Sequence, residues 1–164
     1  EFKIKLNYKK NFKNYICIGV RMSLKNEKDR NININELNNF IKKIRKDNFI
    51  NKIVIVSDLE SYKILKNNRK FLLNKNIFLS KKYLTNFADD GAIILNSTKY
   101  FQLKGTGIQM YAEFSKINYE IFHNYKDYTI FADILRSDLY FNYRKKIKNI
   151  WQTKNQRFLD LSKF

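Results

Sequence analysis

Two short runs of β-branched and apolar residues constrain the fold class of this chain. The first run, 15–20, reads Tyr-Ile-Cys-Ile-Gly-Val, and the second, 52–56, reads Lys-Ile-Val-Ile-Val. Neither run alternates apolar with polar residues, and near-continuous apolar runs are typical of strands that are covered on both faces. Such strands belong to parallel sheets with helices on each side, so the two runs predict an α/β domain.

Segments that favour helices or short strands follow these runs in alternation. Helices are predicted at about 35–48, with Asn35 as its cap, and at 59–71, 83–95 and 108–115; shorter strands are predicted at 76–79, 100–103 and 117–122. Strands that alternate with helices predict one Rossmann-like parallel sheet covered by helices on both faces. An apolar stripe in the tail, 138–164, predicts a further C-terminal helix.

The predicted helix at 83–95 carries both apolar and acidic residues. We expect its apolar side chains to point inward, and the helix to be interrupted at 89–91; the inward set is Leu84, Phe87, Ala88, Ile94 and Leu95. Asp89 and Asp90 resemble a metal-binding pair but have no further ligands beside them in the sequence. A solvated helix face is the better interpretation of the two aspartates.

Polar residues follow three of the predicted strands at the point where each strand ends. Arg21 follows the first strand, Ser57 and Asp58 follow the second, and 104–107 follows the strand at 100–103. In open parallel sheets, ligands bind outside the carboxyl ends of the strands. The sequence therefore predicts a binding site on this edge, made by a basic group, a hydroxyl–carboxylate pair and a glycine turn.

The glycine turn reads Lys104-Gly105-Thr106-Gly107 and leads into the helix predicted at 108–115. A glycine turn before a helix exposes backbone N–H groups at the positive end of the helix dipole, where phosphate binds readily. Lys104 and Thr106 would add a charge and a hydroxyl. The pattern lacks the spacing of a dinucleotide fingerprint or a P-loop, so a tight strand-to-helix turn without a ligand is the alternative.

Length and composition fit one domain, 1–164, with enough apolar residues for a core. Cys17 lies within an apolar run and is expected to be a buried structural thiol, and the single histidine, His123, excludes a site of several histidines.

The formal net charge is +18, from 33 basic and 15 acidic residues. It predicts weak, salt-sensitive binding to nucleic acid and other polyanions. The chain is rich in five residues whose codons are rich in A and T: lysine, asparagine, isoleucine, tyrosine and phenylalanine. The base composition of the source genome therefore explains part of the positive charge.

The order of these features resembles the C-terminal, donor-binding half of GT-B glycosyltransferases, and within them the fucosyltransferase-like and related bacterial surface-polysaccharide enzymes. The matching features are a strand that ends at Arg21, a strand that ends in Ser57-Asp58, and the turn at 105–107 with Glu113 beyond it. That family usually has His-x-Arg-Arg at the first strand end, whereas this chain has Gly19-Val-Arg-Met22. The usual proline after the glycine-turn helix is also absent.

The resemblance implies that the chain binds a nucleotide-sugar and transfers the sugar to a hydroxyl acceptor without a cofactor or an essential metal. Arg21 would neutralise the diphosphate as it leaves, 105–107 would cradle it, and Ser57 and Asp58 would contact ribose or base. Glu113 would bind a ribose or sugar hydroxyl. Helix capping is the better interpretation of Asp58, and a solvated carboxylate is an equal alternative for Glu113. His123 could act as an acid–base group, but a partly buried histidine without that role is favoured.

The resemblance covers about 15–122, so we expect the chain to be the donor-binding half of a larger two-domain enzyme, with the N-terminal half elsewhere. The first residue, Glu1, is not a methionine, which is typical of an excised or processed piece. We expect a cytoplasmic location, or one peripheral to the inner face of a membrane. The alternative function is a non-catalytic basic domain that binds nucleic acid or an anionic surface.

Overall fold

A computed structural model describes residues 14–22, 31–47, 52–68, 74–104, 107–123 and 155–160. The described part forms one six-stranded sheet in which every neighbouring pair is parallel, in the order β3-β2-β1-β4-β5-β6. The strands are β1 Tyr15–Val20, β2 Lys52–Ser57, β3 Ile77–Leu79, β4 Lys99–Leu103, β5 Tyr119–His123 and β6 Gln156–Asp160. The predicted α/β Rossmann-like parallel sheet is confirmed.

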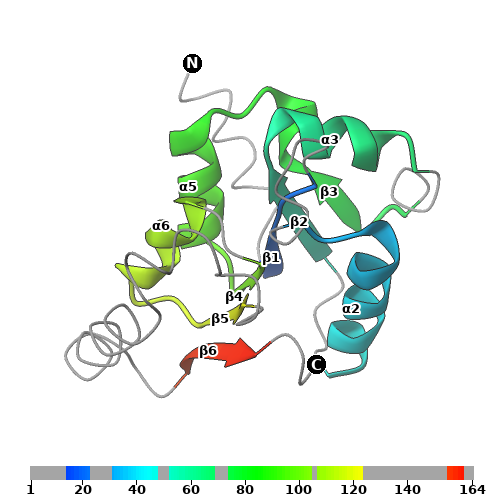
Figure 1. Cartoon of the computed structure of the whole chain (residues 1–164). Coiled ribbons are helices and arrows are strands. Elements are labelled where there is room, and N and C mark those ends of the chain that lie inside the picture. Colours follow the sequence, from blue (N-terminus) through cyan, green and yellow to red (C-terminus); the bar gives the residue numbers. More distant parts are fainter. Residues whose placement is uncertain are drawn as a thin grey trace, which may run out of the picture.

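Helices cover both faces of the sheet (Figure 1). One layer contains α2 (Ile34–Asp47) and α3 (Leu59–Lys66); the other contains α5 (Phe87–Leu95) and α6 (Met110–Glu113). Two short 3₁₀ helices, η2 (Ser80–Tyr83) and η3 (Gly107–Gln109), precede α5 and α6. Both faces of the central strands are buried, which is why their sequences are apolar at successive positions.

Alternate residues of each central strand belong to two separate apolar clusters. Ile16, Ile18 and Val20 of β1 pack on the α2 and α3 side, where α2 contributes Leu37, Phe40, Ile41 and Ile44. Tyr15 and Cys17 point to the other side and pack with Ile94 of α5 and Ala112 of α6. Cys17 is fully buried, as expected for a structural thiol.

Hydrogen-bonded caps set the beginnings of the helices. Asn33, and not Asn35, lies before α2: its Oδ1 accepts from the backbone N–H of Glu36 at 2.9 Å, and Glu36 Oε2 accepts from the backbone N–H of Asn33 at 2.8 Å. Asn86 and Asp89 make the same reciprocal pair before α5, at 2.8 and 2.9 Å. Such a box satisfies two backbone N–H groups that the first helical turn leaves free.

Three expectations about the elements are wrong in detail. Residues 89–91 do not interrupt a helix but lie inside α5; the break falls at 84–86, between η2 and α5. Of the side chains expected to point inward there, only Ile94 is buried. Gln156–Asp160, expected within a C-terminal helix, instead forms strand β6 on β5. The remainder of the predicted tail helix, and the segment 1–13, lie outside the described residues.

Candidate functional site

The strand order reverses direction between β1 and β4. The chain runs outward from β1 through β2 to β3, returns to pair β4 with the other side of β1, and then runs outward through β5 to β6. At such a switch point the two crossover connections leave in opposite directions, which opens a crevice beyond the carboxyl ends of the two strands. Arg21 directly follows β1 and Lys104 directly follows β4, so a basic residue lies after each strand that borders the switch point.

A buried glutamine joins the ends of β1 and β4. Gln102 is fully buried, and its Nε2 donates to the carbonyl oxygens of Gly19 at 3.1 Å and of Lys104 at 2.7 Å. Its Oε1 accepts from the hydroxyl of Tyr100. A side chain at position 19 would overlap both Gln102 and Tyr100, so the glycine in β1 makes room for this pair.

Tyr100 keeps its proton within this network. Burial, and then the nearby Cys17, Glu113 and Asp90, raise the pKa of the Tyr100 hydroxyl well above its ordinary value. A neutral tyrosine can donate a hydrogen bond to the glutamine oxygen, whereas a phenolate could not. Sequence reasoning missed Tyr100 and Gln102 because their pairing with Gly19 depends on the β1–β4 register.

The segment at 31–32 connects the two turns that carry Arg21 and Lys104. The backbone N–H of Ile32 donates to the carbonyl oxygen of Arg21 at 2.9 Å, and Lys104 Nζ donates to the carbonyl oxygen of Asn31 at 2.6 Å. Lys104 itself has a left-handed backbone, with φ of 60°. This bond uses one of the three N–H groups of the ammonium, and the ammonium charge remains at the carboxyl edge.

The glycine turn differs from the expected phosphate-binding arrangement. Gly105 and Thr106 lie outside the described residues. Gly107 is exposed and begins η3, which is followed by the four-residue α6, so the predicted helix at 108–115 is replaced by a short 3₁₀ and α segment. Because so few peptide dipoles align there, a helix dipole contributes little to anion binding at this turn.

Ser57 and Asp58 have structural roles at the end of β2. Asp58 is the N-cap of α3 and accepts from the backbone N–H of Ser61 at 2.7 Å, which agrees with the capping interpretation. Ser57 Oγ donates to the carbonyl oxygen of Asp58 at 3.1 Å. Ser61 Oγ accepts from the backbone N–H of Met22 at 2.7 Å, so α3 is also tied to the end of β1.

Glu113 is half-buried in α6 and accepts from Gln109 Nε2 at 2.6 Å. It lies on the α5 and α6 side of the sheet, where its charge contributes to the raised pKa of Tyr100. His123 ends β5 and stands opposite Asp160 of β6 in the register. Arg21, Ser57, Asp58, Lys104 and Gly107 thus all lie at or after the carboxyl ends of parallel strands, and Glu113 lies on the helix that follows Gly107.

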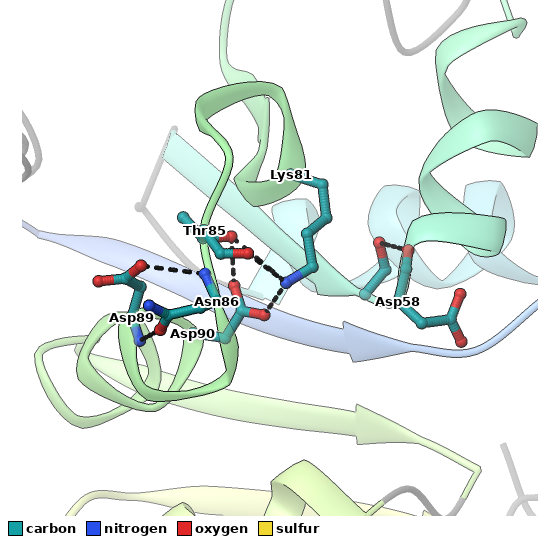
Figure 2. A network of polar contacts seen from close by, with 7 residues as sticks. Asp58, Lys81, Thr85, Asn86, Asp89 and Asp90 are labelled. Carbon is teal, nitrogen blue, oxygen red and sulfur yellow. Dashed lines mark hydrogen bonds and ion pairs between the residues drawn. The ribbon is translucent and has the colours of Figure 1, made fainter.

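The expectation that Asp89 and Asp90 form a solvated face is wrong for Asp90. Asp90 is buried, forms an ion pair with Lys81, and accepts from Thr85 Oγ1 at 2.7 Å. Figure 2 shows Lys81 reaching from η2 to Asp90 and Thr85, with Asp58 apart from this network at the start of α3. Within the described residues, no three histidine, cysteine or carboxylate side chains gather as metal ligands.

Comparisons with protein-family models, with curated proteins and with solved structures find no match to this chain. Among the residues that the structure describes, no helix has the length and apolar character needed to cross a bilayer.

Proposed function

We propose that this domain binds the diphosphate of a nucleotide-sugar at the switch point between β1 and β4 and transfers the sugar to a hydroxyl acceptor. The observation that carries the proposal is the reversal of strand order at β1 and β4, with Arg21 after one strand and Lys104 after the other. Two cationic residues that follow neighbouring strands at the switch point favour a ligand with several negative charges, because each phosphate can receive a charge-assisted hydrogen bond.

Gly107 supports the same proposal. Apart from the two chain neighbours of Gly107, a Cβ atom at this position would meet no atom of the described residues within 4 Å, and the glycine does not have a positive φ. Neither packing nor backbone conformation therefore requires glycine at this exposed position. Close approach of a ligand to the backbone is a further reason for a glycine, and a diphosphate bound against the turn would supply it.

In the proposed reaction the bond between the anomeric carbon and the diphosphate oxygen breaks, and the acceptor oxygen forms a new bond to that carbon. The acceptor proton passes to a base, and the departing diphosphate gains negative charge. Arg21 would stabilise that charge, since a fixed cation contributes most where charge develops in the transition state. Glu113 would contact the nucleoside or the sugar, whereas Ser57 and Asp58 hold the start of α3.

Thermal unfolding in the presence of different phosphates tests the binding step. A nucleoside diphosphate at about 100 times its Kd adds about 2.7 kcal/mol to the free energy of unfolding, which raises Tm by about 5–10 °C. We expect a smaller rise with a nucleoside monophosphate or inorganic phosphate at matched ionic strength. An equal rise with every polyanion would instead support the second candidate, a non-catalytic basic domain, for which the net charge of +18 is the evidence.

A further inference from the structure

Large apolar side chains are exposed at the corner between η2 and α5 and on the adjoining α6. Leu84 is 86% exposed, Phe114 76%, Phe87 53%, Met110 49% and Tyr83 42%. We call these five residues the α5–α6 apolar face. Isolated exposed apolar residues are common on proteins, but several on neighbouring elements mark an interaction surface.

Contacts between α5 and α6 place Phe87 beside the helix that carries Met110 and Phe114, while Tyr83 and Leu84 precede α5 in the chain. The ring of Phe87 lies 5.2 Å from that of Tyr111, which stands next to Met110 in the chain. Gly91 of α5 lets the two helices approach, since a Cβ there would come within 2.6–2.7 Å of the Tyr111 ring. Met110 and Phe114 are one helical turn apart, and the backbone N–H of Phe114 donates to the Met110 carbonyl oxygen at 3.0 Å.

The charges around the face favour an anionic partner. Lys82 and Lys116 are exposed and lie within two residues of Tyr83 and Phe114 in the chain, whereas Asp89 and Glu113 are half-buried and hydrogen-bonded, to the backbone N–H of Asn86 and to Gln109. The whole chain has a net charge of +18. Two copies of so basic a chain repel each other, while an anionic surface attracts it.

We propose that the α5–α6 apolar face docks this protein on an anionic lipid bilayer, with the apolar side chains at the acyl boundary and the lysines among the headgroups. Apolar burial combined with attraction to anionic lipids is the usual basis of interfacial binding. Aromatic side chains such as Phe87, Tyr83 and Phe114 suit this boundary because their rings tolerate both environments. The proposal does not depend on nucleotide binding.

Co-sedimentation with vesicles of phosphatidylcholine, with and without phosphatidylglycerol, tests the proposal. We expect binding to the vesicles that contain phosphatidylglycerol and weaker binding to the neutral ones. The variant Leu84→Asn/Phe114→Ser should bind the anionic vesicles at least about tenfold more weakly, because two exposed apolar side chains no longer leave water. Asparagine accepts the left-handed backbone of position 84, whose φ is 56°, so this variant should fold.

Leu59→Ser is the matched control. Leu59 is 65% exposed but lies in α3, in the layer on the opposite face of the sheet. We expect this variant to bind vesicles like the parent protein. The proposal is overturned if the parent binds no vesicles, if the double variant binds as well as the parent, or if Leu59→Ser loses as much. The proposal is also overturned if sedimentation velocity shows a dimer for the parent and for Leu59→Ser but a monomer for the double variant. A second copy of the chain would then cover the α5–α6 apolar face.

Discussion

Gly19 and Gly107 are glycines for different physical reasons. At Gly19 a Cβ would overlap Gln102 and Tyr100, whereas at Gly107 it would meet none of the described residues within 4 Å apart from the two chain neighbours. We expect Gly19→Ala to lower the free energy of unfolding by about 1–3 kcal/mol, the usual cost of overpacking a buried site. Gly107→Ala should change it by less than about 0.5 kcal/mol, as at most surface sites. Urea denaturation measures both, and equal effects would contradict this account of Gly19.

The adjacent aspartates of α5 also differ. Asp90 is buried against Lys81, whereas Asp89 is half-buried and accepts from the backbone N–H of the N-cap residue Asn86. Replacing Asp90 with alanine leaves a buried ammonium without its counter-charge, which typically costs about 3–5 kcal/mol. Asp89→Ala removes one hydrogen bond of the capping box and keeps the Asn86 cap, so it should cost about 0.5–1.5 kcal/mol. Denaturant titration of the two variants compares them, and a larger loss from Asp89→Ala would contradict the assigned roles.

Cys17 predicts a loss of stability at alkaline pH. Burial, and then the charge of Asp90, raise the pKa of its thiol well above the ordinary value. The folded protein therefore keeps this proton while the unfolded chain loses it above about pH 8.5. The contribution of the Cys17 thiol to the free energy of unfolding is fully present below that pH. Above that pH, the free energy of unfolding falls by about 1.4 kcal/mol per pH unit. Urea denaturation between about pH 7.5 and 10.5 should show this slope develop above about pH 8.5, and Cys17→Ala should reduce it.

At the scale of single elements, apolar runs and capping residues in the sequence predicted those strands and helix ends that depend on neighbouring residues alone. The apolar runs predicted β1 and β2 correctly because each strand is buried on both faces. Asp58 caps α3, as its position after β2 indicated. The start of α5 was missed because the apolar residues at 83–88 suggested a helix, whereas the Asn86–Asp89 box begins it at Phe87. That box was visible in the sequence as an asparagine followed by an aspartate three residues later.

Strand β6 could not be predicted from its own residues. Its residues pair with β5 across a long interval of sequence, and Arg157 and Lys99 both contact the nearly buried carboxylate of Glu120. The residues Gln156–Asp160 alone do not indicate that β5 is their partner, because strand pairing depends on residues that are distant in the sequence. The same limit applies to Gln102, which is an unremarkable polar residue until β1 and β4 are placed side by side.

At the scale of the whole molecule, the strand order is what places the candidate site. The sequence predicted that Arg21, Ser57, Asp58 and the turn after β4 share the carboxyl edge, and the parallel pairing confirms that β1, β2 and β4 all end at that edge. It could not predict which of them border the switch point. The order β3-β2-β1-β4 selects Arg21 and Lys104, while Ser57 and Asp58 follow the next strand outward.

Nucleoside diphosphate affinity, measured by calorimetry on three variants, tests the central proposal. Arg21→Ala should weaken binding by about 1.5–3 kcal/mol, which is about 10- to 150-fold, because it removes a charge-assisted hydrogen bond. Gly107→Val should abolish binding while the protein stays folded, since a Cβ there would meet no described residue within 4 Å apart from the chain neighbours of Gly107. Arg45→Ala is the control: it removes the same charge from the last turn of α2, near Asn74 before β3 and at the opposite edge of the sheet. Unchanged affinity in both Arg21→Ala and Gly107→Val, or an equal loss in Arg45→Ala, would contradict a diphosphate site between β1 and β4.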